Sequence, residues 1–350
     1  MLMDAFSYCE GTTLVMEAIF NIKYMAKQLS RKVAYKSLSE TWTARLLEEG
    51  EEGRGGDEKK VGQDSRVSLN TMKADNHKHT ILTVFPFPNQ CSVQTHTYYI
   101  HSVQSNYNYT VTPIFQPTFS QNHYYLAACT AIDKSPPGQV TAWLKYHFYH
   151  GVDHFTIYLN DRVDFWEHYL RNYTRSGLVN LVEYTYERHK AFFEQASILV
   201  TCNRRYRFAS SLVMYSDVDE YMLTRNTDWR LVDVVKMYDR LFPTVDTFRI
   251  YNTFHACRNY SYSYWGRTQN LLEICPRRWE GIVREERWKQ IVRPCHVPYV
   301  QVHHVSYADS LFINPKKDLV MLHFKMGCNR GPFEAYQLHS QVLEGVLNPF

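Results

Sequence analysis

The sequence has no two cysteines in a C-x-x-C spacing, although it contains eight cysteines, and this argues against a zinc ribbon or a dithiol redox site. Its net charge is only +4 and no stripe of basic residues stands out, which argues against a nucleic-acid-binding protein. No internal repeat is present. What remains is a globular chain of one or two domains, since 350 residues with 45% apolar side chains can bury a sizeable core.

Long apolar segments are also missing. No run approaches the roughly 20 apolar residues that a membrane-spanning helix needs. The best N-terminal window, residues 14–25, is interrupted by Glu17 and Lys23. Asp4 and Glu10 break the pattern of a signal peptide. The sequence therefore shows no membrane anchor, so either the protein is soluble or its true N-terminus differs from this one.

Cysteines and glycosylation sequons favour the secretory pathway, where disulfides persist. Sequons of the N-x-S/T type begin at Asn108, Asn172 and Asn259. Seven of the eight cysteines follow residue 90. We expect at least one disulfide among the six in the region that looks most regularly folded, and the sequence does not determine its pairing: Cys129, Cys202, Cys257, Cys275, Cys295 and Cys328. The alternative is a set of reduced, buried thiols.

Composition divides the chain into three parts. Residues 1–80 are expected to form an N-terminal extension, weakly helical up to about residue 47, with a charged, disordered linker over about 48–64. Residues 81–122 are rich in Val, Thr, Tyr and Phe, which is typical of short strands in a stem-like segment. Residues 123–345 are expected to form the main domain.

Apolar strands alternate with amphipathic helices in the main domain. Strands are predicted near residues 124–131, 154–159, 178–184 and 211–216, and helices near 165–173 and 192–208. A further helix starts near Pro137, carries Trp143 and His147 at helical spacing, and stops at Gly151. This alternation predicts an α/β, Rossmann-like fold, with a mostly parallel sheet and helices on both of its faces.

Ligands of such sheets bind where the strands end. Polar residues follow three of the predicted strands: Asp133 and Lys134, Asn160 and Asp161, and the run Asp217-Val218-Asp219-Glu220. Of these, the D-x-D of the third run is the sharpest feature, because two carboxylates that leave a buried strand can both face the crevice. Mn²⁺ and Mg²⁺ prefer oxygen ligands and usually bind one or two carboxylates together with substrate phosphates. The alternative is a solvated turn that caps the next helix.

Several motifs occur in a recognisable order between residues 124 and 325. They are Tyr125–Cys129, Trp143–His147, Gly151–Tyr158, Ser176–Val179, Gln195 with Cys202, Asp217–Tyr221, Trp288–Pro294, Val302–Val305 and Leu322–Lys325. This succession resembles glycosyltransferase family 92, formerly a domain of unknown function. The corresponding family motifs are a cysteine-containing strand, E-W-x-x-x-H, G-V-x-H-F-x-x-Y, D-x-D-E-F, K-x-I-V-R-P and two C-terminal histidine motifs.

The resemblance implies a GT-A fold over residues 123–345, which would then be the catalytic domain. It also implies inverting transfer of galactose from UDP-galactose to a glycan or glycoprotein acceptor, with Mn²⁺ or Mg²⁺ as cofactor. Family members are usually membrane-anchored, which implies a place in the Golgi. This sequence departs from the family at two positions: Ala142 replaces the glutamate before the helix tryptophan, and Phe254-His255 replaces F-G.

The residues assigned to the site follow from the strand ends and the motifs. The catalytic candidates are Asp217, Asp219 and Glu220. The candidates for binding the nucleotide sugar are Asp133, Lys134, Asn160, Asp161, Asp217, Lys289 and Arg293. The candidate metal ligands are Asp219, Asp217, His323 and His304, with His303 as a competing histidine.

Three alternatives stay open at this point. Lys289 and Arg293 could instead form surface pairs with Glu285 and Glu286. The general base is not chosen by the sequence; His255, Asp246 and Glu273 are candidates. As a whole, the protein could be a non-catalytic sugar-binding or scaffold protein with the same fold, as Ala142 suggests, or a metal-dependent phosphohydrolase, since carboxylates at strand ends also serve that chemistry.

Overall fold

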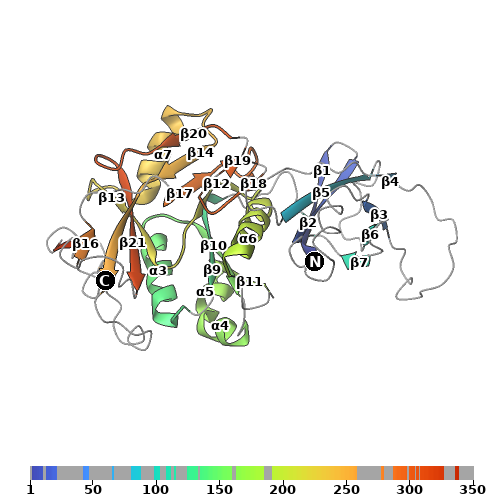
Figure 1. The fold of residues 1–350 in the computed structure, drawn as a ribbon, viewed down its shortest axis with the longest axis horizontal. Helices are drawn as coiled ribbons and strands as arrows, with labels where there is room; N and C mark the ends of the chain where they lie inside the picture. The colour runs from blue at the N-terminus through green and yellow to red at the C-terminus, as the bar shows by residue number, and fades with distance from the viewer. Residues whose placement is uncertain are drawn as a thin grey trace. The chain divides into compact units, whose positions relative to one another are not determined.

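The chain folds into two compact units, shown in Figure 1: residues 1–122 with 192–208, and residues 123–191 with 209–350. The structure, a computed structural model, describes the following residues: 2–10, 13–21, 42–46, 65–66, 80–87, 98–102, 108–111, 114–115, 124–132, 135–159, 163–184, 191–257, 277–279, 287–297, 299–303, 305–306, 308–326 and 336–338.

The first unit contains two four-stranded sheets, ordered β5-β2-β1-β8 and β4-β3-β6-β7. Their strands are β1 (Leu2–Glu10), β2 (Thr13–Asn21), β3 (Trp42–Leu46), β4 (Ser65–Arg66), β5 (Thr80–Phe87), β6 (Tyr98–Ser102), β7 (Asn108–Val111) and β8 (Ile114–Phe115). Helix α6 (Ala191–Arg205) belongs to the same unit and matches the helix predicted near residues 192–208. The charged linker predicted over about 48–64 lies outside the described residues.

The expectation of weak helix over residues 1–47 is wrong, because β1, β2 and β3 lie there. Strands β1 and β2 pair antiparallel, with Glu10 opposite Thr13. Only Gly11 and Thr12 separate them, and a glycine-containing loop of two residues is the typical connection of a hairpin. Pairing of β2 with β5, far along the chain, adds cross-strand contacts that a local reading of helical periodicity cannot include.

The central sheet of the second unit has seven strands in the order β11-β10-β9-β12-β17-β14-β20. They are β9 (Tyr124–Ile132), β10 (His154–Leu159), β11 (Val179–Glu183), β12 (Ser210–Tyr215), β14 (Thr247–Ile250), β17 (Lys289–Val292) and β20 (Ser310–Phe312). Neighbours are parallel from β11 to β12 and between β14 and β20, whereas β17 is antiparallel to both β12 and β14. The predicted α/β fold with a mostly parallel sheet is confirmed.

A second sheet of this unit is ordered β13-β21-β15-β16-β22. Its strands are β13 (Glu220–Thr224), β15 (Asn252–Cys257), β16 (Arg277–Trp279), β21 (Leu319–Met326) and β22 (Tyr336–Leu338); a separate pair joins β18 (Tyr299–Val300) to β19 (Val305–Ser306). Strand β13 starts five residues after β12 ends, so the chain passes from the central sheet to the second sheet through the D-x-D.

Helix α3 (Pro137–Tyr149) supports the start of the second sheet. It buries Trp143, whose indole N–H donates to the carbonyl of Glu220 at 3.1 Å, and Tyr146, whose hydroxyl donates to the carbonyl of Met222 at 2.8 Å. The helix stops at Gly151, which has φ +90°, as the sequence predicts. A Cβ at Gly151 would lie 2.4 Å from a methyl of Val232, so this glycine also permits close approach of helix α7 (Leu231–Leu241), far along the chain.

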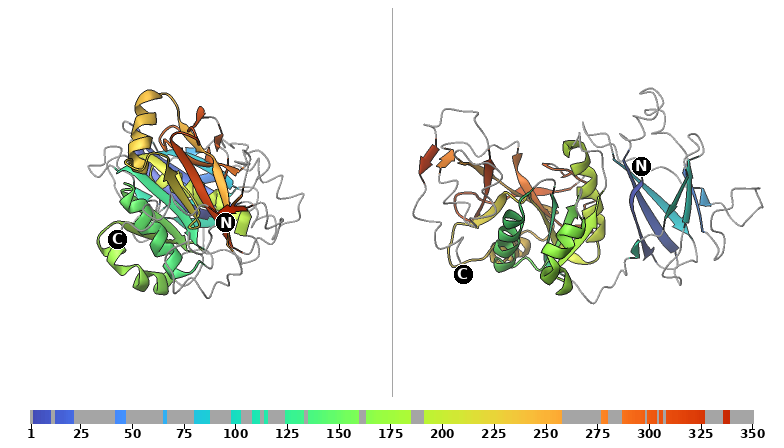
Figure 2. Two further views of the ribbon diagram at one scale, coloured as in Figure 1. Left: turned by 90° about the vertical axis from the view of Figure 1, so that its left-hand side faces the viewer. Right: turned by 90° about the horizontal axis from the view of Figure 1, so that it is seen from below.

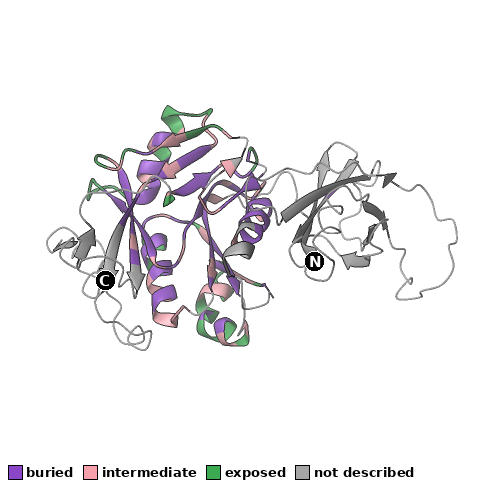
Figure 3. Ribbon diagram, in the orientation of Figure 1, coloured by how far each residue is buried: buried purple, intermediate pink, exposed green. Residues whose placement is uncertain are grey.

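The remaining helices are α4 (Val163–Tyr169), α5 (Arg171–Arg175) and α7 (Leu231–Leu241). The helix predicted over 165–173 is therefore divided in two, with Leu170 at the division. The apolar core of the second unit is formed by residues of its sheets and helices. Most residues of its central strands are buried in Figure 3, and Figure 2 shows the same elements from two further directions. Among the described residues, no helix is long and apolar enough to cross a membrane.

The prediction of at least one disulfide is confirmed, because Cys129 and Cys202 are both disulfide-bonded. Cys295, by contrast, is exposed and is not part of a disulfide. The other three cysteines of the predicted set have side chains outside the described residues.

Candidate active site

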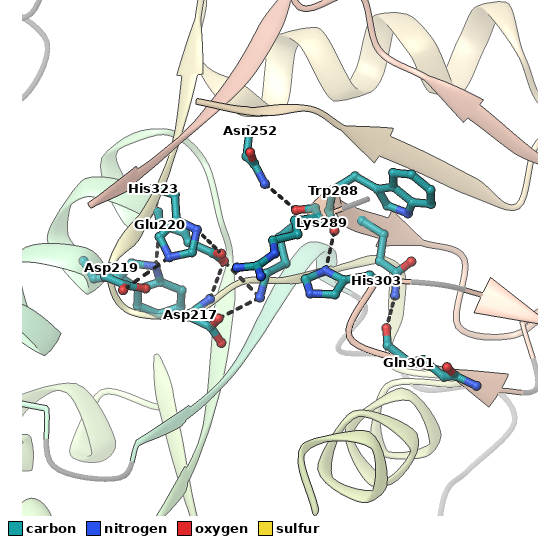
Figure 4. A network of polar contacts seen from close by, with 12 residues as sticks. Asp217, Asp219, Glu220, Asn252, Trp288, Lys289, Gln301, His303 and His323 are labelled. Atoms are coloured by element: carbon teal, nitrogen blue, oxygen red, sulfur yellow. Dashed lines mark hydrogen bonds and ion pairs between the residues drawn. The ribbon is translucent and has the colours of Figure 1, made fainter. Parts of the chain in front are cut away.

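The D-x-D forms a tight turn between two sheets. After β12 ends at Tyr215, the N–H of Glu220 donates to the carbonyl of Asp217 at 3.0 Å, which closes the turn. The N–H of Asp217 donates to Oε2 of Glu220 at 2.8 Å, so the glutamate side chain folds back over the same turn. Figure 4 shows the resulting group of polar side chains. The turn thus fixes three carboxylates, those of Asp217, Asp219 and Glu220, in a short stretch of backbone.

Lys289 enters this group from the neighbouring strand. Because β17 runs antiparallel to β12 with Gln290 opposite Tyr215, Lys289 lies beside the residues that follow β12. Its Nζ lies 2.8 Å from Oδ2 of Asp217 and 3.1 Å from Oε2 of Glu220. The side chain is only 4% exposed, so the surface pairing considered from the sequence does not apply to Lys289.

His323 enters from the second sheet, directly opposite Glu220 in the β13–β21 pair. Its Nε2 lies 3.5 Å from Oδ2 of Asp219, and its Nδ1 lies 3.4 Å from Oε1 of Glu220. The neighbouring Phe324 donates its backbone N–H to the carbonyl of Asp219 at 2.9 Å. Strand β21 therefore fixes both the histidine and the backbone of the aspartate that it faces.

Asp219, Glu220 and His323 together could hold a metal ion. One ligand atom from each lies within 4.8 Å of the others. Two carboxylate oxygens with one imidazole nitrogen form a mixed donor set, and such a set suits Mn²⁺ and similar divalent ions. The residues present therefore fit a divalent cation. Asp217 lies outside this group of three, and its Oδ2 is paired with Lys289.

The side chains of the cluster alter one another's proton affinity. Burial alone would raise the pKa of Asp217, but the Lys289 ammonium outweighs it and holds the pKa below its usual value. Burial raises the pKa of Glu220 to about 7, although Lys289 opposes that rise. Burial would lower the pKa of Lys289, yet the charges of Asp217 and Glu220 raise it. Burial would likewise lower the pKa of His323, but Asp219 and Glu220 raise it above its usual value.

The backbone around Lys289 is held by side chains from neighbouring segments (Figure 4). Asn252 of β15 donates from Nδ2 to the carbonyl of Arg287 at 2.5 Å. His303 bonds the carbonyl of Trp288 through Nδ1 at 3.0 Å. His303 also contributes to the low pKa of Asp217 through its charge, so it lies near the cluster without belonging to the group that could hold a metal.

Other predicted site residues are not brought to this cluster. Arg293 pairs with Asp239 of α7 and donates from Nε to the carbonyl of Val245 at 2.9 Å. Asp246, a candidate base, accepts from the N–H of Asp309 at 3.2 Å and lies 2.9 Å from Nδ1 of His296. Seven more candidates have side chains outside the described residues: Asp133, Lys134, Asn160, Asp161, His255, Glu273 and His304.

Sequence reasoning assigned Glu220 to catalysis but did not include it among the metal ligands. Its place in the cluster follows from two features, the tight turn after Asp217 and the register that sets it opposite His323. The first could have been suspected, because Glu220 follows the D-x-D directly. The second depends on the pairing of β13 with a strand about 100 residues later, for which the sequence carries no local signal.

Comparison with known proteins gives one family. The family model described as Glycosyltransferase family 92 matches residues 126–344. No curated protein matches the sequence.

Among solved structures, the similar chains include S. aureus TarS 1-349, with a TM-score of 0.34 and 8% identity over 56% of this chain and 60% of that chain. TarS in complex with UDP has a TM-score of 0.34 and 9% identity, covering 58% and 60% of the two chains. TarS in complex with UDP-GlcNAc has a TM-score of 0.34 and 7% identity, covering 57% and 58%. This chain therefore spans less than two thirds of the TarS chains, and a likeness this distant does not bear on its function.

Proposed function

This chain belongs to glycosyltransferase family 92, and we propose that it is an active, metal-dependent enzyme of that family. The observation that carries the proposal is the group formed by Asp219, Glu220 and His323, whose ligand atoms lie within 4.8 Å of one another at the turn that follows β12. The group lies where an α/β sheet binds its ligands, beyond the carboxyl end of a central strand. A solvated turn that only caps a helix does not account for a histidine supplied by another sheet.

The proposed donor is a nucleotide sugar, specifically UDP-galactose, and the proposed acceptor is a glycan or glycoprotein hydroxyl. The family supports this choice. Asp219, Glu220 and His323 would hold the cation, Mn²⁺ or Mg²⁺. When bound, such an ion neutralises the charge that develops on the diphosphate leaving group. Without the cation, the negative carboxylates would repel the diphosphate and oppose its binding.

The proposed stereochemical course is inversion by a single displacement. The acceptor oxygen forms a bond to the anomeric carbon of the sugar while the bond from that carbon to the UDP oxygen breaks. The acceptor proton passes to a base, and UDP leaves. The proposed location is the secretory pathway, in the Golgi, which the disulfide-bonded Cys129 and Cys202 support because disulfides persist in oxidising compartments.

The test is a screen of UDP-sugars with Mn²⁺, scored by UDP release with and without a mixture of glycan acceptors. We expect release with UDP-galactose, and more of it when an acceptor is present. Binding of UDP-sugars without release from any of them would favour the non-catalytic alternative. Release of phosphate from simple esters, with no UDP-sugar turnover, would favour a phosphohydrolase and contradict the proposal.

A further inference from the structure

The Lys289 ammonium occupies a position in the cluster that a cation would otherwise be expected to fill. It lies 2.8 Å from a carboxylate oxygen of Asp217 and 3.1 Å from one of Glu220. The side chain of Lys289 is 4% exposed and that of Glu220 is 1% exposed, so water screens little of the charge between these two groups, whereas Asp217 is 39% exposed and is screened more. Two carboxylates on one turn, with a third beside them, repel one another strongly in such surroundings unless a positive charge lies between them.

The two carboxylate oxygens of Glu220 have different partners, and Lys289 is the partner of one of them. Oε2 lies 3.1 Å from the lysine and accepts the backbone N–H of Asp217 at 2.8 Å. Oε1 lies 3.4 Å from Nδ1 of His323. The lysine and the turn together therefore hold one oxygen of Glu220 on the side of Asp217 and leave the other on the side of the group that could hold a metal.

We propose that Lys289 is a positioning residue, a built-in counter-cation that withholds Asp217 from metal binding and turns Glu220 toward Asp219 and His323. This inference rests on the metal dependence proposed above. It replaces the expectation that Lys289 contacts the donor diphosphate, because its Nζ is already engaged by two carboxylates. With this lysine in place, the cluster accepts one divalent ion, and Asp217 is left to contact other parts of the substrate.

The experiment is a double-mutant cycle on the binding of Mn²⁺ alone, measured by calorimetry and by electron paramagnetic resonance on the full chain without sugar donor. The variants are Asp217→Asn, Lys289→Met, and the two combined. We expect the loss of Mn²⁺ affinity caused by Asp217→Asn to be at least about fivefold larger in the Lys289→Met background, where Asp217 becomes available to the metal. Equal losses in the two backgrounds would overturn the proposal.

Two control variants separate charge from position. Lys289→Arg keeps the positive charge and should keep the small effect of Asp217→Asn. Lys145→Met removes an exposed lysine on α3 and should leave Mn²⁺ binding unchanged. A different result would show that the lysine contacts the diphosphate instead. In that case Lys289→Met binds UDP more weakly in the absence of metal, and Asp217→Asn causes equal losses of Mn²⁺ affinity in the two backgrounds.

If Lys289→Met does not fold, or if the native protein binds no Mn²⁺, thermal melts test whether Lys289 acts as the counter-charge of Asp217 and Glu220. Removal of the lysine alone leaves the buried Glu220 and the partly exposed Asp217 without a counter-charge, whereas the double variant also removes the charge of Asp217. We expect the double variant to recover a cooperative melt at a higher temperature than Lys289→Met. No recovery would overturn the proposal. Absence of Mn²⁺ binding with such recovery would contradict the proposed metal dependence, and would leave Lys289 only as the counter-charge of Asp217 and Glu220.

Discussion

The two ends of strand β17 carry the two basic residues of one sequence motif, and their surroundings differ. Lys289, at the start of the strand, is 4% exposed and is shared between Asp217 and Glu220. Arg293, just past the end, is 14% exposed and pairs with Asp239, whose other oxygen accepts the hydroxyl of Tyr125 at 2.9 Å. At about 3.3 Å per residue, four residues of strand separate them by roughly 13 Å.

The surplus of acidic groups distinguishes the two ends. At the Lys289 end, the lysine pairs with Asp217 and Glu220, while Asp219 adds a third carboxylate beside His323, and the surplus of negative charge can attract a cation. At the Arg293 end, Asp239 and Arg293 balance each other, and Arg293 also donates to the carbonyl of Val245. We infer that the first arrangement serves a ligand, whereas the second joins α7 to the sheet. This division predicts different effects of substitutions at the two ends of β17.

The largest effect is expected from Asp219→Asn. Asparagine keeps the size and one oxygen but removes the charge on which a hard cation depends. Turnover at saturating Mn²⁺, measured by UDP release, should fall roughly a thousandfold or more. A thermal melt should stay close to that of the native protein, since the Asp219 side chain is 28% exposed. The matched control is Asp239→Asn at the other end of β17, which should keep turnover within about twofold. Near-native turnover of Asp219→Asn would remove the motif from catalysis.

The second expected effect is on donor affinity. Without a divalent cation, the diphosphate meets the carboxylates of Asp217 and Asp219 directly and is repelled. UDP should therefore bind at least about tenfold more weakly in EDTA than with Mn²⁺, as measured by calorimetry. Equal affinities in the two conditions would contradict the role assigned to the Lys289 end as a cation site.

The third effect should appear in stability alone. Arg293→Gln breaks a largely buried ion pair and should lower the free energy of unfolding by about 1–3 kcal/mol. For a domain of this size that corresponds to a fall of about 3–10 °C in Tm. The KM for the donor should change by less than about twofold. A large increase in KM at native Tm would place Arg293 at the donor and contradict its assignment to the packing of α7.

The smallest effect concerns two uncharged histidines behind the turn. Burial lowers the pKa of His147 to about 3, and burial with the Arg230 charge lowers that of His150 to about 4. The unfolded chain binds protons at these positions below about pH 6.5 whereas the folded chain does not. Stability should therefore fall as the pH drops from 6.5 toward these folded values. Between pH 7.5 and 5.0, His147 should account for up to about 2 kcal/mol of that loss.

Urea unfolding of His147→Phe at the two pH values checks this expectation. Phenylalanine keeps an aromatic ring beside Tyr221 and Trp143 but cannot bind a proton. The loss of stability on acidification should shrink in this variant and stay unchanged in His168→Phe, which alters an exposed residue. An unchanged response of His147→Phe would mean that the acid sensitivity arises elsewhere, for example in the charged clusters at the ends of β17.

Much of the second unit could be predicted from its sequence. Strands β9, β10, β11 and β12 are short apolar runs bounded by polar or glycine residues, and local pattern is enough to find them. In the first unit, the expectation of weak helix over residues 1–47 is wrong because the strands there owe their stability to partners such as β5, which lies some 60 residues beyond β2. Local periodicity does not contain that information.

The site divides in the same way. Asp217 and Asp219 could be identified from the strand that precedes them. The partnership of Lys289 with Asp217 and Glu220 could not, because it depends on antiparallel pairing over about 70 residues. Arg293 belongs to the same sequence motif as Lys289, yet the direction of β17 carries it away from the cluster.

The pairing of Glu220 with His323 has a consequence for folding. Successive side chains of a strand point to opposite faces, so a slip of β21 by one residue would turn His323 away from Asp219 and Glu220. A cation held by all three would bind the correctly registered sheet more tightly than any slipped one. The free energy of cation binding would then also favour the native register of β21, which pairs with β13 although it follows about 100 residues later in the sequence. Metal binding would therefore select molecules in which β13 and β21 are correctly paired, before any sugar donor binds.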